Sequence, residues 1–345
     1  MPPPHAPASH TAAEHAAVRG GVGLIDRGDH GLLEVTGRDR AKFLHAMLSN
    51  DVVALTPGQG CAATLLDVHG KVQVLLRVLA LDERLLVITP PDLAAKTNEA
   101  LDAYLFSEKA YFRDATGEEA MVMVAGPEAV GLAQRLTGVL PDDRAWSHAK
   151  GAIDGAPVRV VRGSGETGEP EFWLMSAAVD GPRAWDAACA AGATPVGRAA
   201  FESLRIEAGT PVFPEDIGPS VLLPEVPFAH LVSYAKGCYI GQEVIVRIRD
   251  RGHVNRLLRG LVLEGETVPE AGAPVLAGDA EIGKVTSAAW SYSLGRSVAL
   301  ALVRRQHADA GTAVTVRVED AAVRATVADL PFARGRGSAG EYVIG

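Results

Sequence analysis

The hydrophobic positions in the first third of the chain follow strand-like and helix-like spacings in turn. Residues 31–36 alternate in the manner of a strand, and Gly37 then leads into a helix with one apolar face. The apolar residues of that face are Phe43, Leu44, Met47 and Leu48. Further strands are predicted at residues 62–66, 72–81 and 85–88, and a proline pair at residues 90–91 opens a second helix. Strands and helices mix without strict βαβ alternation, so the pattern predicts an α+β module.

A second α+β segment follows, with a strand near Met121, a helix over residues 128–136 and a strand at 158–162. Residues 163–168 match the G-x-G-x-x-G pattern of dinucleotide-binding proteins. In such a site the motif passes from a strand into a helix, whose N-terminal amide groups face the pyrophosphate. Here the strand-like residues 172–175 follow instead, so we predict a hairpin turn.

Beyond residue 195 the pattern of hydrophobic positions changes. A helix that begins near Pro195 ends at Gly209, and prolines then interrupt the chain as far as Phe228. After Gly260, short alternating runs separated by glycine predict a small β-barrel or β-sandwich. These runs lie at residues 261–263, 282–286, 298–302, 314–318 and 322–327. The predicted fold class is therefore α+β, with two α+β modules at residues 21–118 and 119–255 and an all-β domain at 256–345.

Length and composition agree with a globular protein of several domains. A chain of 345 residues is longer than one hydrophobic core usually organises. Charged residues break the longest apolar runs, so no membrane span is expected. The segment 1–20 is rich in Pro, Ala and His and resembles neither a signal peptide nor a transit peptide, which predicts a disordered lead. The net charge of −9 argues against nucleic-acid binding.

Three cysteines, Cys61, Cys189 and Cys238, are too far apart in sequence to suggest a disulfide framework or a self-contained metal-binding motif. We infer a reducing, cytoplasmic environment. Cys189 follows Trp185 at helical spacing and is predicted to lie in a core, whereas Cys61 precedes an apolar strand and is ambiguous.

The most informative motif is Lys-Gly-Cys-Tyr-Ile-Gly-Gln-Glu at residues 236–243. Lys236 lies two residues from Cys238 and could favour its thiolate, while Gly237 and Gly241 let the backbone approach a ligand closely. A buried structural cysteine in a glycine-punctuated turn is the alternative interpretation, because free cysteine is often found in protein interiors.

Four stretches together resemble the folate-binding family that contains the glycine-cleavage T-protein (aminomethyltransferase) and its YgfZ-type relatives. They are Asn50 and Asp51 with residues 58–70, residues 204–209 with 216–217, residues 236–243, and residues 282–287 with 330–332. The resemblance covers roughly residues 25–335, and the cysteine of the third stretch resembles the YgfZ-type branch. It implies that residues 21–255 form a folate-binding region and residues 256–345 a C-terminal β-barrel, arranged around a central cavity.

Two departures from the transferase pattern bear on chemistry. In transferases of the family a pair of aspartates follows the glycine that corresponds to Gly70, whereas this chain has Gln73 and Val74 there. Asp67 lies three residues before that glycine, in a turn, and need not point the same way. A glutamate that grips the pterin ring in the family is replaced by Trp173, which could stack on a flat heterocycle or serve only packing.

The resemblance to the YgfZ-type branch implies a folate-binding accessory protein for the assembly or repair of iron–sulfur clusters. Tetrahydrofolate would be its cofactor, and iron–sulfur proteins or their assembly machinery would be its partners. Cys238 would be the active residue, with Lys236 stabilising its thiolate. The residues expected at the folate site are Asn50, Asp51, Trp173, Arg205, Glu207, Tyr239, Gln242, Glu243 and Arg247. For Arg205 and Glu207, an ion pair at the end of a helix is an equal alternative.

Two other functions are compatible with these residues. A tetrahydrofolate-dependent aminomethyltransferase, or a related one-carbon transferase, would need a carboxylate near the folate nitrogen, which Gln73 and Val74 do not supply. A cysteine-dependent transferase or thiol-redox enzyme would pair Cys238 with a base such as His253 or His230.

An arginine-rich stretch completes the list of candidate contacts. If Arg247 and Arg249 lie on an alternating strand, they share one face and, with Arg256, could bind the γ-linked glutamates of a polyglutamylated folate. A solvated charged surface is the alternative.

Overall fold

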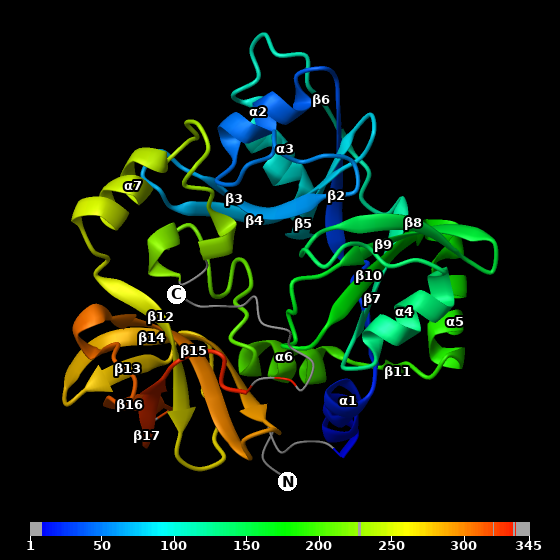
Figure 1. Ribbon diagram of the computed structural model, residues 1–345. Coiled ribbons are helices and arrows are strands. Elements are labelled where there is room, and N and C mark those ends of the chain that lie inside the picture. The colour runs from blue at the N-terminus through cyan, green and yellow to red at the C-terminus, as the bar shows by residue number, and fades with distance from the viewer. Residues whose placement is uncertain (1–8, 227–228, 320, 334, 336–345) are drawn as a thin grey trace.

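The computed structural model describes residues 9–226, 229–319, 321–333 and 335, which form two sheets with helices and a separate β-barrel. Figure 1 shows the first sheet at the top, the second at the right and the barrel at the lower left. The predicted α+β class with a C-terminal barrel is confirmed.

The first sheet has the strand order β3-β4-β5-β2-β6 and is antiparallel throughout. Its strands are β2 (His30–Thr36), β3 (Gly60–Leu66), β4 (Val72–Ala80), β5 (Leu85–Pro91) and β6 (Tyr111–Asp114). Helices α2 (Arg40–Met47) and α3 (Ala94–Asp102) accompany it. Alternate positions of β4 are fully buried, and its remaining face carries the less buried residues Gln73, Leu75 and Arg77. That second face is the one that reaches the candidate site.

The second sheet has the order β11-β1-β7-β10-β9-β8. Its strands are β1 (Gly23–Asp26), β7 (Glu119–Ala125), β8 (His148–Ile153), β9 (Ala156–Arg162), β10 (Glu171–Ala177) and β11 (Thr194–Pro195), with helices α4 (Ala129–Thr137) and α5 (Gly181–Ala190). Strand β1 pairs with β7 and β11, so the beginning of the predicted first module belongs to the second sheet. Residues 163–168 join the antiparallel strands β9 and β10, which confirms the predicted hairpin.

The barrel closes in the order β12-β15-β14-β13-β16-β17. Its strands are β12 (Arg256–Leu263), β13 (Pro274–Ala277), β14 (Ala280–Ser291), β15 (Arg296–Arg304), β16 (Ala313–Val318) and β17 (Ala321–Ala328). Of the two predicted alternatives, the structure adopts the barrel. Alternation along these strands provides a separate apolar core inside it.

Helices α1 (Ser9–Gly20) and α6 (Arg198–Glu207) connect the bodies. Helix α1 packs on α6, and α6 packs on β14 of the barrel. The prediction of a disordered lead over residues 1–20 is wrong for residues 9–20, which are helical, with Val18 fully buried. Polar contacts of His15 and Arg19, rather than an apolar stripe, hold this helix against α6. The amino-acid composition of the segment therefore did not indicate a helix. Residues 1–8 lie outside the described part of the chain.

Helix α7 (Gln242–Arg251) replaces the strand predicted for the arginine-rich stretch. Gly241 adopts a left-handed conformation, with φ of 80°, and starts the helix. Because residues two apart point in different directions on a helix, Arg247 and Arg249 do not share a face. None of the described helices has the length and apolar character needed to cross a bilayer.

Candidate functional site

A small cavity lies where the two sheets meet the segment that leads from α6 toward the 236–243 motif. It has a volume of about 40 Å³ and is partly open on one side. The lining residues are Ala62, Leu75, Arg77, Trp146, Ser164, Glu166, Thr210, Pro211, Ile217, His230 and Leu231. They come from β3, β4, the turn before β8, the β9–β10 hairpin and the chain after α6, so only the folded structure brings them together.

Two arginines and one glutamate form a buried ion-pair cluster beside this cavity. The Glu166 carboxylate accepts a hydrogen bond from Arg27 Nη2 at 2.9 Å and a second, short one from Arg77 Nη2. Arg27 also donates to His30 Nε2 at 3.1 Å, while the His30 Nδ1 lies 2.8 Å from an Asp29 oxygen. Burial in the core makes this charge pairing obligatory, because an unpaired buried charge is strongly destabilising.

The protonation states in the cluster are set by burial and by these charges. Burial alone would raise the pKa of Glu166, but the guanidinium groups of Arg27 and Arg77 lower it below its usual value. Burial also lowers the pKa of His30 to about 4, so its ring is neutral near pH 7. Glu171 has the opposite shift, because burial and the charge of Glu166 raise its pKa.

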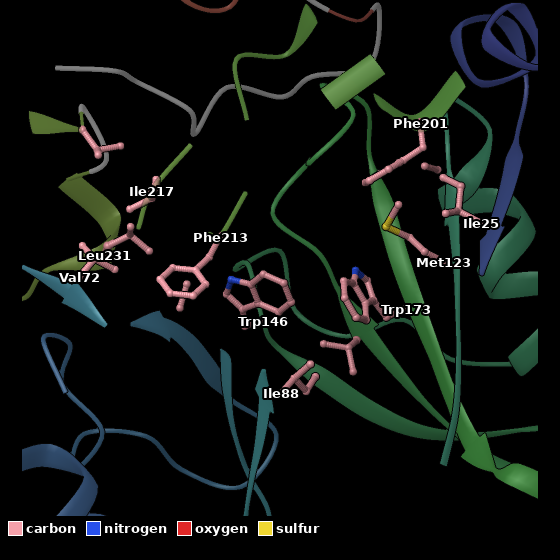
Figure 2. Packing of buried hydrophobic residues seen from close by; sticks show 14 of the residues in the cluster. Ile25, Val72, Ile88, Met123, Trp146, Trp173, Phe201, Phe213, Ile217 and Leu231 are labelled. Carbon is pink, nitrogen blue, oxygen red and sulfur yellow. The ribbon is translucent and has the colours of Figure 1, made fainter. Parts of the chain in front are cut away.

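Tryptophan rings enclose the guanidinium groups. The Arg27 guanidinium lies 4.9 Å from the ring centre of Trp173, and that of Arg77 lies 5.2 Å from the ring centre of Trp146. The two indoles meet edge to face at 6.0 Å, as Figure 2 shows. Trp173 is completely buried and does not line the cavity, so the structure supports its packing role and not the predicted stacking on a ligand.

Trp146 has an unusual backbone conformation for a bulky residue, with φ of 66°. Its N–H bonds to the Arg162 carbonyl at 2.8 Å, which helps to hold this conformation. The indole Nε1 is buried, and it has no hydrogen-bond partner within the described residues. In Figure 2 this nitrogen faces Phe213 and points away from Trp173. Strain of this kind concentrates at functional sites, which marks Trp146 as a residue of interest.

Lys236 has a different role from the one predicted for it. Its ammonium group donates to the carbonyl oxygens of His45, Leu48 and Asn50, with distances of 2.7 Å to Leu48 and 3.0 Å to Asn50. A Lys side chain has three donors, and all three are accounted for by these carbonyls at the end of α2. Burial lowers the pKa of Lys236 to about 8. The predicted stabilisation of the Cys238 thiolate by Lys236 is therefore wrong, because the ammonium is committed to a helix end.

The other residues of the 236–243 motif form the turn before α7. Cys238 is exposed, whereas the Tyr239 ring is buried 5.0 Å from the Lys236 ammonium. The Tyr239 backbone N–H donates to Gln242 Oε1 at 3.3 Å, so Gln242 holds this turn. Glu243 is exposed in the first turn of α7. None of the four lines the central cavity.

Asn50 does not line the cavity but bonds to two residues that do. Its Nδ2 donates to the carbonyls of Ala62 and His230, two residues of the cavity wall, at 2.8 and 2.9 Å. Asp51 faces outward, accepting a hydrogen bond from the Ala54 N–H and lying 3.1 Å from His45 Nδ1.

Arg205 and Glu207 are buried on α6, but they do not pair with each other and do not line the cavity. Arg205 donates to Glu202 and, at 2.7 Å, to Asp216, and it also reaches Ser287 of the barrel. Glu207 accepts from His15 and Arg19 of α1 and from Ser291 at the end of β14. Both residues therefore join α6 to neighbouring bodies, and each finds its partners outside the predicted pair.

Strand β4 places no carboxylate in the cavity; it contributes Leu75 and Arg77. Asp67 is occupied elsewhere, since its Oδ1 accepts hydrogen bonds from the backbone N–H groups of His69 and Lys71. Glu166, from the β9–β10 hairpin, supplies the cavity carboxylate instead. Sequence reasoning missed Arg27, Arg77 and Glu166, and the only available signal was the alternation that puts Arg77 on the same face of β4 as Leu75.

Comparison with known proteins decides the family. The GCVT N-terminal domain family matches residues 4–236, and the glycine cleavage T-protein C-terminal barrel domain family matches residues 256–333. The chain belongs to the glycine cleavage T-protein family. An aminomethyltransferase of Frankia alni is 36% identical over 93% of this chain and 88% of its own length. An aminomethyltransferase of Streptomyces avermitilis is 32% identical over 93% of this chain and 89% of its own length.

A solved T-protein has the same fold. The glycine cleavage system aminomethyltransferase T of Bartonella henselae superimposes with a TM-score of 0.85, at 23% identity, over 95% of this chain and 90% of its own. The predicted function in iron–sulfur cluster assembly or repair is contradicted. The relatives that match this chain over nearly its whole length are named aminomethyltransferases. The cysteine of the 236–243 motif was too small a feature to assign the branch.

The central cavity does not accommodate a folate in this arrangement. Small-molecule sites usually enclose roughly 300–1,000 Å³, whereas this cavity holds about 40 Å³. Both oxygens of Glu166 are engaged by arginines, so the carboxylate is not available to grip a pterin. A wider groove of about 730 Å³ lies between the barrel and the 214–221 segment. Ile217 of the same segment lines the central cavity.

Proposed function

We propose that this T-protein family member is a tetrahydrofolate-dependent one-carbon transferase, and that aminomethyl transfer is its reaction. The observation that carries the proposal is the 36% identity to an aminomethyltransferase along 93% of the chain. Similarity of that extent includes both the folate-binding region and the barrel, so it supports a shared reaction better than a shared fold alone would.

The protonation states of two buried glutamates decide which of them could donate a proton. Glu166 is held ionised by Arg27 and Arg77 and is therefore a poor proton donor near neutral pH. Glu171, whose pKa is raised, is the neighbouring carboxyl group that keeps its proton there. Because the cavity as it stands is smaller than a folate, we assign no step to the cofactor.

The finer predictions about the site are proposals on this basis. Asn50 is the predicted residue with the best claim to a role near the ligand, since both acceptors of its Nδ2 belong to the cavity wall. Polyglutamylated tetrahydrofolate is the proposed form of the acceptor. Arg247 and Arg251 lie four residues apart on α7, both exposed, and could bind its glutamates from one face of the helix.

A transfer assay tests the function. The purified protein is mixed with an aminomethylated carrier protein and tetrahydrofolate, and the consumption of the aminomethyl group is followed. We expect consumption that requires both the protein and the folate. A known aminomethyltransferase serves as the positive control for the carrier. If that enzyme consumes the carrier and this protein does not, the proposed reaction is wrong.

A further inference from the structure

The buried cluster beside the central cavity carries more positive than negative charge. Arg27 and Arg77 contribute two guanidinium ions, and Glu166 contributes one ionised carboxylate. Glu171 is only 2% exposed; its Oε2 accepts a hydrogen bond from the Glu166 N–H at 2.8 Å, and its Oε1 has no hydrogen-bond partner among the described residues. Because it is buried beside the ionised Glu166, it is the carboxyl group of the pair that keeps its proton. Asp29 contacts His30, and its own side chain is 64% exposed to solvent. The count leaves one positive charge in excess.

Neither histidine near the cavity changes that count. His30 accepts from Arg27 through Nε2 and is therefore uncharged. His230, in the cavity wall, has its pKa lowered to about 4 by burial and is neutral near pH 7. An uncompensated charge in a protein interior is costly, so a matching anion at this position would stabilise the fold.

A hydrogen-bond donor in the cavity wall also lacks an acceptor. Trp146 is 3% exposed, lines the cavity, and has an indole Nε1 without a partner among the described residues. Figure 2 shows this nitrogen on the side of Phe213 and Leu231, and Leu231 is itself a lining residue. A buried indole N–H normally finds an acceptor. Two hydroxyl groups, of Ser164 and Thr210, belong to the same wall.

The volume limits what can enter. A cavity needs roughly 10–15 Å³ of such volume to hold one water molecule, and this one has about 40 Å³. It therefore takes a ligand of a few non-hydrogen atoms, and the excess positive charge and the free donor select an anion over a neutral molecule.

We propose that the central cavity is a binding site for one small monovalent anion of the size of formate, bound by Arg77 and the Trp146 indole N–H. The hydroxyl groups of Ser164 and Thr210 complete its surroundings. The proposal does not depend on the proposed transferase reaction, because the test measures anion binding without folate. A ligand of three non-hydrogen atoms should bind with a dissociation constant no lower than about 1 mM.

Sodium formate is the probe, and thermal unfolding of the full chain without folate is the measurement. At 100 mM formate we expect the unfolding midpoint to rise by roughly 3–6 °C, and above the dissociation constant to keep rising with the logarithm of the formate concentration. The same concentration of sodium 2-(N-morpholino)ethanesulfonate, whose anion is too large for the cavity, is the control for ionic strength. Calorimetric titration with formate provides an independent dissociation constant.

Variants then locate the site. Trp146→Phe removes the N–H and keeps an aromatic ring, so formate binding should weaken about tenfold. Trp185→Phe on α5, away from the cavity, is the matched control and should bind like the original protein. If Trp146→Phe does not fold, Thr210→Val tests the same wall and should weaken binding several-fold. No rise in the unfolding midpoint beyond that of the control salt, no saturable heat in the calorimetric titration, or equal binding by these variants and the original protein would each overturn the proposal.

Discussion

Lys236 donates a hydrogen bond of 2.7 Å to the carbonyl oxygen of Leu48, the residue that ends helix α2. The same ammonium reaches the carbonyls of His45 and Asn50, so one side chain satisfies three acceptors at a helix C-terminus. Lys236 of the 236–243 motif thus joins two segments of the region that matches the GCVT N-terminal domain family.

We expect Lys236→Met to destabilise the protein by about 2–4 kcal/mol, because hydrogen bonds from a charged group are lost and buried carbonyls remain. The reactivity of Cys238 should not change. Urea unfolding and alkylation kinetics measure the two effects. Lys71→Met, at an exposed lysine, is the control and should stay within about 0.5 kcal/mol. A large fall in alkylation rate with unchanged stability would restore the thiolate role of Lys236.

One cysteine should react quickly with a thiol reagent in the folded protein. Cys238 is exposed, whereas burial raises the pKa of Cys61 to about 12 and keeps it a thiol. Cys238→Ser should remove the fast phase and leave stability nearly unchanged. Cys61→Ser should keep the fast phase. If the fast phase persists in Cys238→Ser, the assignment is wrong.

Glu166→Gln should cost about 3–5 kcal/mol of stability, because it leaves two buried guanidinium groups without their anion. Glu118→Gln, which breaks an exposed pair with Arg113, should cost at most about 1 kcal/mol. Chemical unfolding near pH 7 compares the two variants. Similar losses would show that the arginines find another partner.

The lowered pKa of Glu207 predicts how the stability of the protein changes in acid. Burial would raise its pKa, but hydrogen bonds from His15 and Arg19 lower it to about 2 in the folded protein, from a usual value of 4.5. A lowered folded pKa stabilises the fold above the unfolded pKa, and this contribution is lost as the pH falls through the folded one. Stability should therefore decline between about pH 4.5 and pH 2. The gap between the original protein and Glu207→Gln should narrow over that window by up to roughly 3 kcal/mol. A gap that does not change with pH would contradict the assignment.

The affinity for a polyglutamylated folate should depend on arginines of helix α7. If Arg247 and Arg251 bind it, tetrahydrofolate with several glutamates should bind more tightly than the monoglutamyl form, and 0.5 M salt should reduce the difference. Arg247→Glu should also reduce the difference. Arg317→Glu, on the barrel strand β16, is the control. Equal binding of the two forms at low salt would leave these arginines as a solvated surface.

Local patterns in the sequence determined the α+β class, the β-rich C-terminal domain and the hairpin at residues 163–168. These features depend on side-chain period and on turn residues that act within a few positions of one another. The same locality explains why a strand was considered for Arg247 and Arg249, which lie on helix α7: charged residues there left helix and strand periods hard to separate. The family resemblance also came from local motifs, and so did the assignment to the YgfZ-type branch, which the comparisons do not support.

Only the tertiary structure decided the composition of the central site. Arg27, Arg77 and Glu166 come from segments far apart in the chain, and they meet because two sheets pack against each other there. Charge pairing in an interior depends on which side chains the packed elements bring within about 3 Å of each other. A local sequence pattern does not predict contacts between segments that are far apart in the chain. The same reason applies to helix α1, whose Arg19 is paired with Glu207 across 188 positions of sequence.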